Sequence, residues 1–306
     1  MIVNFLLFRV MPGDPALLML PRNPDQDTEA LYEANVERMG LDKPWPEQII
    51  PYFVNTFIGE WGDSYIKKAP VIEVVGRALS WTCLLLVWSS ILTFALGIYL
   101  GKVAARRRGK AADLTITAFG IFFYGMPIFW FGIILMVVFC SELHLLPSGG
   151  YISAGTQPFP LTLDKIVDMG EHVLLPGMTL VIGAIAGLVL IQRNSLIDVL
   201  TEDYIVTAYA KGLSEKQVMK KHATPNARLP IVTTIAMDTA FILGGAFQVE
   251  YVFSYKGLGW LTIEAIDKKD YPVLQFVFLI GGVAVVIANL IADLLLVKLD
   301  PRVTIT

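Results

Sequence analysis

Long apolar runs decide what this chain can fold into. A transmembrane helix needs about 20 mostly apolar residues to cross a hydrocarbon core of roughly 30 Å. The runs that clearly meet this requirement are 81–103, 114–140, 173–191 and 271–297. The chain is 55% hydrophobic and only 17% charged, whereas soluble proteins average about 45–50% apolar and about 25% charged. The pattern excludes an ordinary soluble enzyme and a disordered chain, and it predicts an all-α polytopic membrane protein.

Two further apolar segments are less regular. The run 229–253 contains the polar residues Asp238 and Glu250, so we expect a fifth span there whose charged groups face the protein or water. Residues 1–11 would form a helix of only about 16 Å, roughly half a bilayer. No basic n-region and no cleavage site mark this segment as a signal peptide. We interpret it as a partial first span whose beginning is missing or misassigned.

Basic residues between the runs predict the orientation. They concentrate in 102–110, 193–228 and the C-terminal tail, which the positive-inside rule places in the cytoplasm. This predicts a multi-pass protein of the cell (inner) membrane with six crossings and both termini cytoplasmic. The segment 12–80 then lies outside, before the transmembrane core 81–306. It carries expected amphipathic helices at 25–39 and 44–57, which form either a structural cap or a docking surface.

The segment 193–228 is far longer than a simple helix connection requires. Thr201 is expected to cap a helix over 202–211, and Gly212 is a natural stop in the left-handed conformation. Ser214 and Gln217 have the spacing of a capping box, which predicts a second helix. The sequence therefore predicts a helix, a glycine corner and another helix.

The first helix of this corner is expected to expose apolar and small side chains that another surface can approach. These are Tyr204, Ile205, Ala208, Tyr209 and Leu213. Such a patch favours docking of a protein partner. The alternatives are a loop lying on the membrane, a patch for anionic lipid and a DNA-binding helix-turn-helix. The net charge of −3 and the tether between two spans argue against nucleic acid.

Residues 201–216 (TEDYIVTAYAKGLSEK) strongly resemble the coupling-loop signature of ABC importer permeases of the dipeptide, oligopeptide and nickel branch. Shorter matching stretches follow in order along nearly the whole chain: 12–15 (PGDP), 59–64 (GEWGDS), 105–109 (ARRRG), 146–149 (LPSG), 250–254 (EYVFS), 270–272 (DYP) and 300–302 (DPR). One departure is that the older motif opens with Glu-Ala-Ala, whereas the aligned residues here are Val206, Thr207 and Ala208.

The resemblance implies a six-helix type I importer transmembrane domain in the lipid bilayer. It implies a second similar permease, two cytoplasmic ATPase subunits and an extracytoplasmic solute-binding protein as partners. Di- or oligopeptides are the expected cargo, with oligosaccharides or nickel as alternatives, and an ion-coupled secondary transporter is the hypothesis of another class. The residues expected to couple to the ATPase are Asp203, Tyr204, Thr207, Ala208, Ala210, Lys211, Gly212, Leu213 and Ser214.

The residues show no catalytic, nucleotide or metal site. The phosphate-binding pattern Gly-x-x-x-x-Gly-Lys-Ser/Thr does not occur, so we expect no enzyme activity and no cofactor on this chain, with ATP and Mg²⁺ on the partner subunits. The three histidines share no metal-ligand spacing. Candidate residues of a translocation pathway are Asp238, Tyr124, Pro127 and Trp130. Asp238 is either a structural acid or a group that meets cationic substrates, and the aromatic residues form either a gate or a lipid-facing surface.

Overall fold

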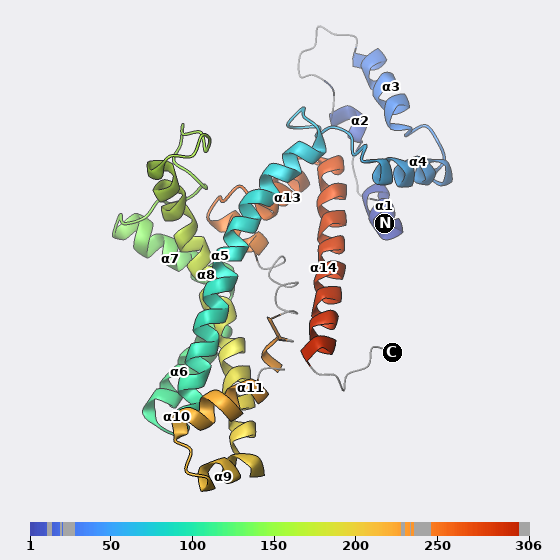
Figure 1. Ribbon diagram of the computed structural model, residues 1–306. Coiled ribbons are helices and arrows are strands. Elements are labelled where there is room, and N and C mark those ends of the chain that lie inside the picture. Colours follow the sequence, from blue (N-terminus) through green and yellow to red (C-terminus); the bar gives the residue numbers. More distant parts are fainter. Residues whose placement is uncertain are drawn as a thin grey trace. The chain divides into compact units, whose positions relative to one another are not determined.

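The computed structural model describes residues 1–10, 14–18, 20, 28–227, 230–232, 234–235 and 246–299. Within these ranges the regular structure is helical and no strand occurs, apart from an isolated bridge between Asp63 and Pro70. The helices are labelled in chain order in Figure 1. The chain divides into two compact units, Met1–Thr82 with Lys256–Val283, and Cys83–Tyr255 with Ala284–Thr306. Two of the three boundaries fall inside long helices, and the third, between Tyr255 and Lys256, lies in a turn.

The first unit holds the short helices of the N-terminal region and two elements from late in the chain. These are α1 (Ile2–Val10), α2 (Pro15–Leu18), α3 (Thr28–Met39), α4 (Trp45–Ile58) and α13 (Leu258–Asp267), with the first parts of α5 (Val71–Arg106) and α14 (Tyr271–Leu299). The side chain of Asn4 in α1 donates to the Tyr52 hydroxyl at 3.1 Å and to the Gln275 carbonyl at 2.9 Å. The segment predicted as a partial span is thus a helix tied to α4 and α14.

A buried carboxylate joins distant parts of this unit. Asp270, only 2% exposed, accepts the hydroxyl hydrogen of the buried Ser64 and the backbone N–H groups of Tyr65 and Ile66, at 3.1 and 3.3 Å. The ammonium groups of Lys67 and Lys268 each lie 2.8 Å from the Glu264 carboxylate. We call Ser64, Lys67, Glu264, Lys268 and Asp270 the Asp270 clamp. It holds the loop before α5 against the junction of α13 and α14.

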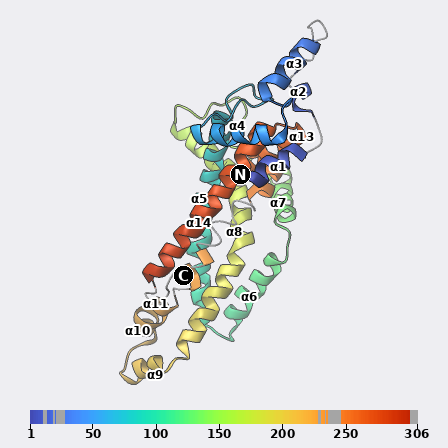
Figure 2. The ribbon, with the colours of Figure 1, turned by 90° about the vertical axis from the view of Figure 1, so that its right-hand side faces the viewer.

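The second unit is built around one long helix, α8 (Leu163–Leu200). Its other elements are the remainders of α5 and α14, α6 (Ala111–Tyr124), α7 (Ile128–Met136), the π-helix η1 (Val137–Glu142), α9 (Asp203–Ala210), α10 (Glu215–Val218), the π-helix η2 (Met219–Ala223), α11 (Thr224–Asn226) and a helical stretch at 246–252. The side-by-side course of α6 and α8 can be followed in Figure 2.

Glycines let α5 pack closely on α8. A Cβ atom added at Gly97 would lie 2.7 Å from Leu188 Cδ2, and one added at Gly101 would lie 2.6 Å from Gln192 Cβ. Two glycines four residues apart on one helix face form the small-residue spacing typical of close helix pairs in membranes. The contacts therefore fix which face of α5 meets α8.

The run predicted as one span at 114–140 is interrupted. The chain bends by 99° between α6 and the helix that α7 and η1 form together, with Gly125 and Pro127 at the bend. Proline lacks the N–H that a continuous helix needs, and it disfavours helical geometry in the residue before it. The run 114–140 is therefore two helices joined at a break, and not one continuous helix.

Three helices among the described residues are long and apolar enough to cross a membrane: Val71–Arg106, Leu163–Leu200 and Tyr271–Ile291. The bent pair of α6 with α7 and η1 makes a fourth if it is counted as one broken span. Most of the predicted span 229–253 lies outside the described residues. The number of crossings and the bounds of the three segments 1–11, 12–80 and 81–306 therefore stay predictions.

Candidate functional site

The predicted helix, glycine corner and second helix are present after α8. Helix α9 runs over Asp203–Ala210, Gly212 has a φ of +80°, and α10 begins at Glu215. The prediction that Thr201 caps the first helix is wrong, because Glu202 occupies that position. The Thr201 hydroxyl instead donates to the Asp198 carbonyl at 2.7 Å and closes the end of α8. We call residues 202–227 the docking corner (Figure 1).

Two contacts hold the second helix of the docking corner. The side-chain oxygen of Gln217 accepts the Ser214 N–H at 2.9 Å, which is the backward contact of a capping box. The Arg106 guanidinium at the end of α5 lies 2.9 Å from the Glu215 carboxylate. Beyond α10 the chain continues through η2 and α11. Pro225 lies in the first turn of α11, where a proline is tolerated because its N–H would have no helical partner.

An apolar core seats the docking corner on the ends of α5 and α8. Ile205 and Ala208 are 1% and 4% exposed, so the prediction that they face solvent is wrong. They pack in one buried cluster whose members are Ala105, Leu196, Ile205, Ala208, Val218, Met219, Ala223 and Ala227. Residues three apart lie on one helix face, and in α9 this face turns toward the protein. The docking corner is therefore a packed structure.

All but one of the remaining predicted coupling residues lie on the outside of the docking corner. The exposed ones are Asp203, Tyr204, Thr207, Ala210, Lys211, Gly212 and Ser214. Leu213 is half-buried and packs against the apolar core. Sequence reasoning missed Val206, which at 64% is more exposed than Tyr204 at 42% and Tyr209 at 44%. We call Tyr204, Val206 and Tyr209 the exposed face of α9. The sequence carries no signal that separates Val206 from the buried Ile205, because both are apolar residues of the same short helix.

A buried ion pair lies close to the docking corner and was not predicted. Arg193 of α8 contacts Asp113 of α6 through two hydrogen bonds, from Nε to Oδ1 at 2.6 Å and from Nη2 to Oδ2 at 2.8 Å. The Gly109 N–H donates to the same carboxylate at 2.9 Å, and the Thr117 hydroxyl donates at 3.4 Å. The Asp113 side chain is 3% exposed and the Arg193 side chain is 22% exposed, so the burial is that of the carboxylate. This two-pronged geometry is the strongest form of an arginine–carboxylate contact.

The electrostatics of the pair follow from this geometry. Hydrogen bonding by Arg193 outweighs the opposing effect of burial and, with the Gly109 N–H, lowers the pKa of Asp113 to about 2. The same hydrogen bonds raise the pKa of Arg193 above its ordinary value. Both groups lie just outside the predicted spans 114–140 and 173–191. The pair therefore stays ionised at every physiological pH.

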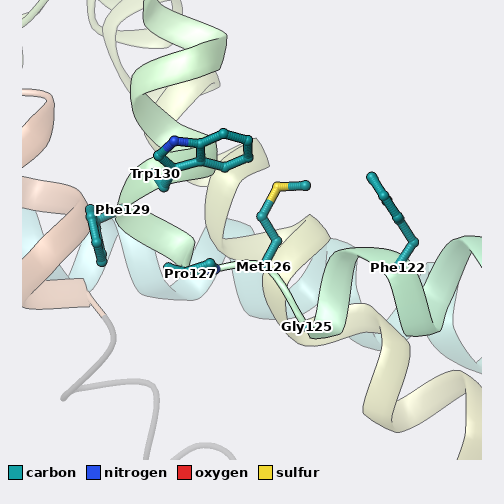
Figure 3. A pocket seen from close by; sticks show the side chains of 6 residues that line it. All are labelled: Phe122, Gly125, Met126, Pro127, Phe129 and Trp130. Carbon is teal, nitrogen blue, oxygen red and sulfur yellow. The ribbon is translucent and has the colours of Figure 1, made fainter.

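The break between α6 and α7 forms an apolar hollow of about 490 Å³. Figure 3 shows Phe129 and Trp130 of α7 on one side of the break and Phe122 of α6 on the other, with Met126 between them. Pro127 and Trp130, two of the predicted pathway residues, line the hollow, whereas Tyr124 is 70% exposed and does not line it. Asp238 lies outside the described residues.

The comparisons with known proteins agree with these features. The family described as binding-protein-dependent transport system inner membrane component matches residues 94–305. The oligopeptide transport system permease protein AppB of Bacillus subtilis (strain 168) is 35% identical over 304 residues, which cover 99% of this chain and 93% of AppB. The chain belongs to this permease family. The dipeptide transport system permease protein DppB of Escherichia coli (strain K12) is 34% identical over 320 residues, which cover 99% of this chain and 93% of DppB.

A solved structure shows the same fold. An inward-facing conformation of the MetNI methionine ABC transporter contains a chain that superposes with a TM-score of 0.60 at 16% sequence identity, covering 75% of this permease and 97% of that chain. The permease thus has the all-α type I importer fold, and it is a multi-pass membrane component of a transport system. Its family is the non-catalytic part of such systems, which work with an ATPase and a solute-binding protein.

Proposed function

We propose that this permease forms half of the translocation pathway of an ATP-driven importer of di- or oligopeptides. The observation that carries the proposal is the likeness over 99% of the chain to permeases named for oligopeptides and dipeptides. A second, similar permease forms the other half, two ATPase subunits bind ATP and Mg²⁺, and an extracytoplasmic binding protein delivers the peptide. This chain binds no cofactor of its own.

The docking corner is the part that meets the ATPase. The basic residues of 102–110 and 193–228 support a cytoplasmic position for it and for both termini. The exposed face of α9 supplies the apolar contact, and Asp203, Thr207, Ala210, Lys211, Gly212, Leu213 and Ser214 surround it. Ala208 serves in a different way, because its burial with Ile205 anchors the corner to α5 and α8.

The hollow beside Pro127 supports a place for the pathway at the break between α6 and α7. Backbone that is not helical at membrane depth is tolerated where it is buried in protein or lines a water-filled cavity. Pro127 and Trp130 are therefore the pathway residues that the geometry supports, and Tyr124 flanks them. For Asp238, we expect Asp238→Asn to reduce uptake of cationic peptides more than uptake of neutral ones, whereas equal effects would assign Asp238 a structural role.

Reconstitution tests the proposed cargo. The permease is placed in proteoliposomes with its partner permease, ATPase subunits and binding protein, and uptake of a labelled dipeptide is measured. We expect uptake to require ATP and the binding protein and to be insensitive to ionophores. Uptake driven by an ion gradient without the ATPase subunits would instead indicate a secondary transporter. Binding of an oligosaccharide or nickel, and of no peptide, by the binding protein in a thermal-shift assay would contradict the peptide cargo.

A matched pair of substitutions tests the docking surface. Val206→Asp places a charge on the exposed face of α9, whereas Val206→Thr keeps nearly the same shape without a charge. We expect the aspartate variant to insert normally and to lose co-purification of the ATPase, while the threonine variant retains it. Equal recovery of the ATPase with both variants would show that the ATPase does not contact Val206.

A further inference from the structure

The Asp113–Arg193 pair shares helix α8 with the seat of the docking corner. Leu196, three residues after Arg193, is fully buried in the corner core. Residues three apart on a helix lie on neighbouring positions of one face. A displacement of the docking corner therefore acts on α8 within one turn of Arg193.

The other member of the pair lies at the start of α6. Helix α6 follows Lys110, whose side chain makes no capping hydrogen bond. The Asp113 carboxylate instead accepts the N–H of Gly109. From Asp113, α6 runs for three turns to the break at Gly125 and Pro127. The pair thus connects the seat of the docking corner to the helix that leads to the apolar hollow.

Burial makes this connection hard to open. Separating the pair would leave the Asp113 carboxylate, 3% exposed, without its counter-charge, and an unpaired buried charge is strongly unfavourable. The exposed pair of Arg106 and Glu215 differs, because its side chains are 50% and 57% exposed and water can replace either partner. Of these two ion pairs, only that of Asp113 with Arg193 is costly to separate.

We propose that Asp113 and Arg193 are a positioning pair that makes α6 move as one body with α8 and the docking corner. This inference rests on the proposed function, since the docking corner must be the part that the ATPase moves. The movement then reaches the break at Gly125 and Pro127 through α6, and the break is the point where the helix direction can change. Arg193 and Asp113 contact neither peptide nor ATP.

A distance measurement tests the joint directly. Spin labels are placed at Thr115→Cys on α6 and Asp198→Cys on α8, both exposed, in a background where Cys83→Ser and Cys140→Ser remove the native thiols. The complete complex is measured without nucleotide and after trapping with ATP and vanadate. We expect one label-to-label distance in both states, and two distances once Arg193→Gln is added. A distance that changes between the states with the pair intact overturns the inference.

The second readout is the number of peptides transported per ATP hydrolysed. We expect Arg193→Gln to lower this ratio about tenfold, within the range typical of coupling between distant sites, while ATP hydrolysis stimulated by the binding protein persists. Arg193→Lys keeps the charge but loses the two-pronged contact, and we expect its ratio to lie between that of the unaltered permease and that of Arg193→Gln. Arg108→Gln removes the same charge from the neighbouring loop outside the pair and should leave the ratio unchanged. An unchanged ratio in Arg193→Gln, or a parallel loss of hydrolysis and transport, overturns the inference.

A double variant keeps the test decisive if Arg193→Gln does not assemble. Asp113→Asn with Arg193→Gln leaves no unpaired buried charge, and we expect it to assemble and to show the same lowered ratio. Its normal coupling would overturn the inference. Failure of the proposed function is separate, because it shows as the absence of ATP-dependent peptide uptake in the unaltered permease, whatever the state of the pair.

Discussion

The docking corner and the Asp270 clamp are both tight, ordered turns, but they are held in different ways. The corner rests on apolar side chains, with Ile205 and Ala208 packed against the ends of α5 and α8. The clamp rests on polar groups, with Ser64 hydrogen-bonded to Asp270 across 206 positions of sequence. An apolar seat tolerates changes that conserve volume, whereas each lost acceptor in a buried polar network leaves donors unsatisfied. We therefore expect the clamp to be the less forgiving of the two.

The largest effect is expected from Asp270→Ala. The substitution removes the acceptor of the buried Ser64 hydroxyl and of the partly buried Tyr65 and Ile66 N–H groups, and a buried donor without a partner costs about 1–3 kcal/mol. We expect a loss of about 4 kcal/mol, measured as a lowered unfolding temperature of the purified complex. Asp270→Asn keeps one acceptor oxygen and should lose less. Equal unfolding temperatures for both variants and the unaltered permease would show that the clamp does not stabilise this unit.

A somewhat smaller effect is expected from Ile205→Ala in the corner. Truncating a buried isoleucine costs about 2–5 kcal/mol, depending on how far the surroundings collapse. Ile205 is 1% exposed and Val206 is 64% exposed, so Val206→Ala is the matched control. Amide hydrogen exchange over residues 203–223 should accelerate in Ile205→Ala only, and exchange around the Asp270 clamp should not change. Acceleration in both variants would show that the corner has no defined inner face.

Gly212→Val separates backbone strain from crowding. Nothing lies within 4 Å of an added Cβ atom, but the φ of +80° disfavours any residue with a side chain. The left-handed region costs a residue with a Cβ atom about 1–2 kcal/mol, and asparagine tolerates it better than valine does. We expect Gly212→Val to weaken ATPase recovery and Gly212→Asn to retain most of it. A result in the reverse order would point to a contact that Gly212 makes with the partner.

The smallest effect is a pH dependence of the Asp270 clamp. Burial acts to raise the pKa of Glu264, but hydrogen bonds and charge from Lys268 and Lys67 outweigh it and lower the pKa below its ordinary value. A lowered pKa in the folded state adds stability above the ordinary glutamate pKa, and this stability is lost as the pH falls through the lowered value. For a partly exposed pair we expect below about 1 kcal/mol. The gap in unfolding temperature between the unaltered permease and Glu264→Gln should close on acidification, and a gap that widens would contradict this sign.

Local sequence signals predicted a large part of the fold and the site. Runs of about 20 apolar residues predicted α5, α8 and α14 because a helix that faces lipid needs no tertiary partner to satisfy its backbone. Gly212 and the Ser214–Gln217 spacing predicted the docking corner because glycine conformation and helix capping act within a few residues. The ordered motifs along the chain predicted the family that the comparisons show.

The tertiary structure decided what depends on residues far apart. The inward turn of Ile205 and Ala208 is set by Ala105 and Leu196, and no periodicity within α9 distinguishes that side from the other. The pair of Asp113 with Arg193 and the bond of Ser64 with Asp270 join residues 80 and 206 positions apart. The sequence by itself determined that long apolar helices form and that the chain turns at Gly212, since those choices depend on neighbouring residues. Which charges meet in buried pairs was decided only by folding, because desolvation selects partners by their position in space.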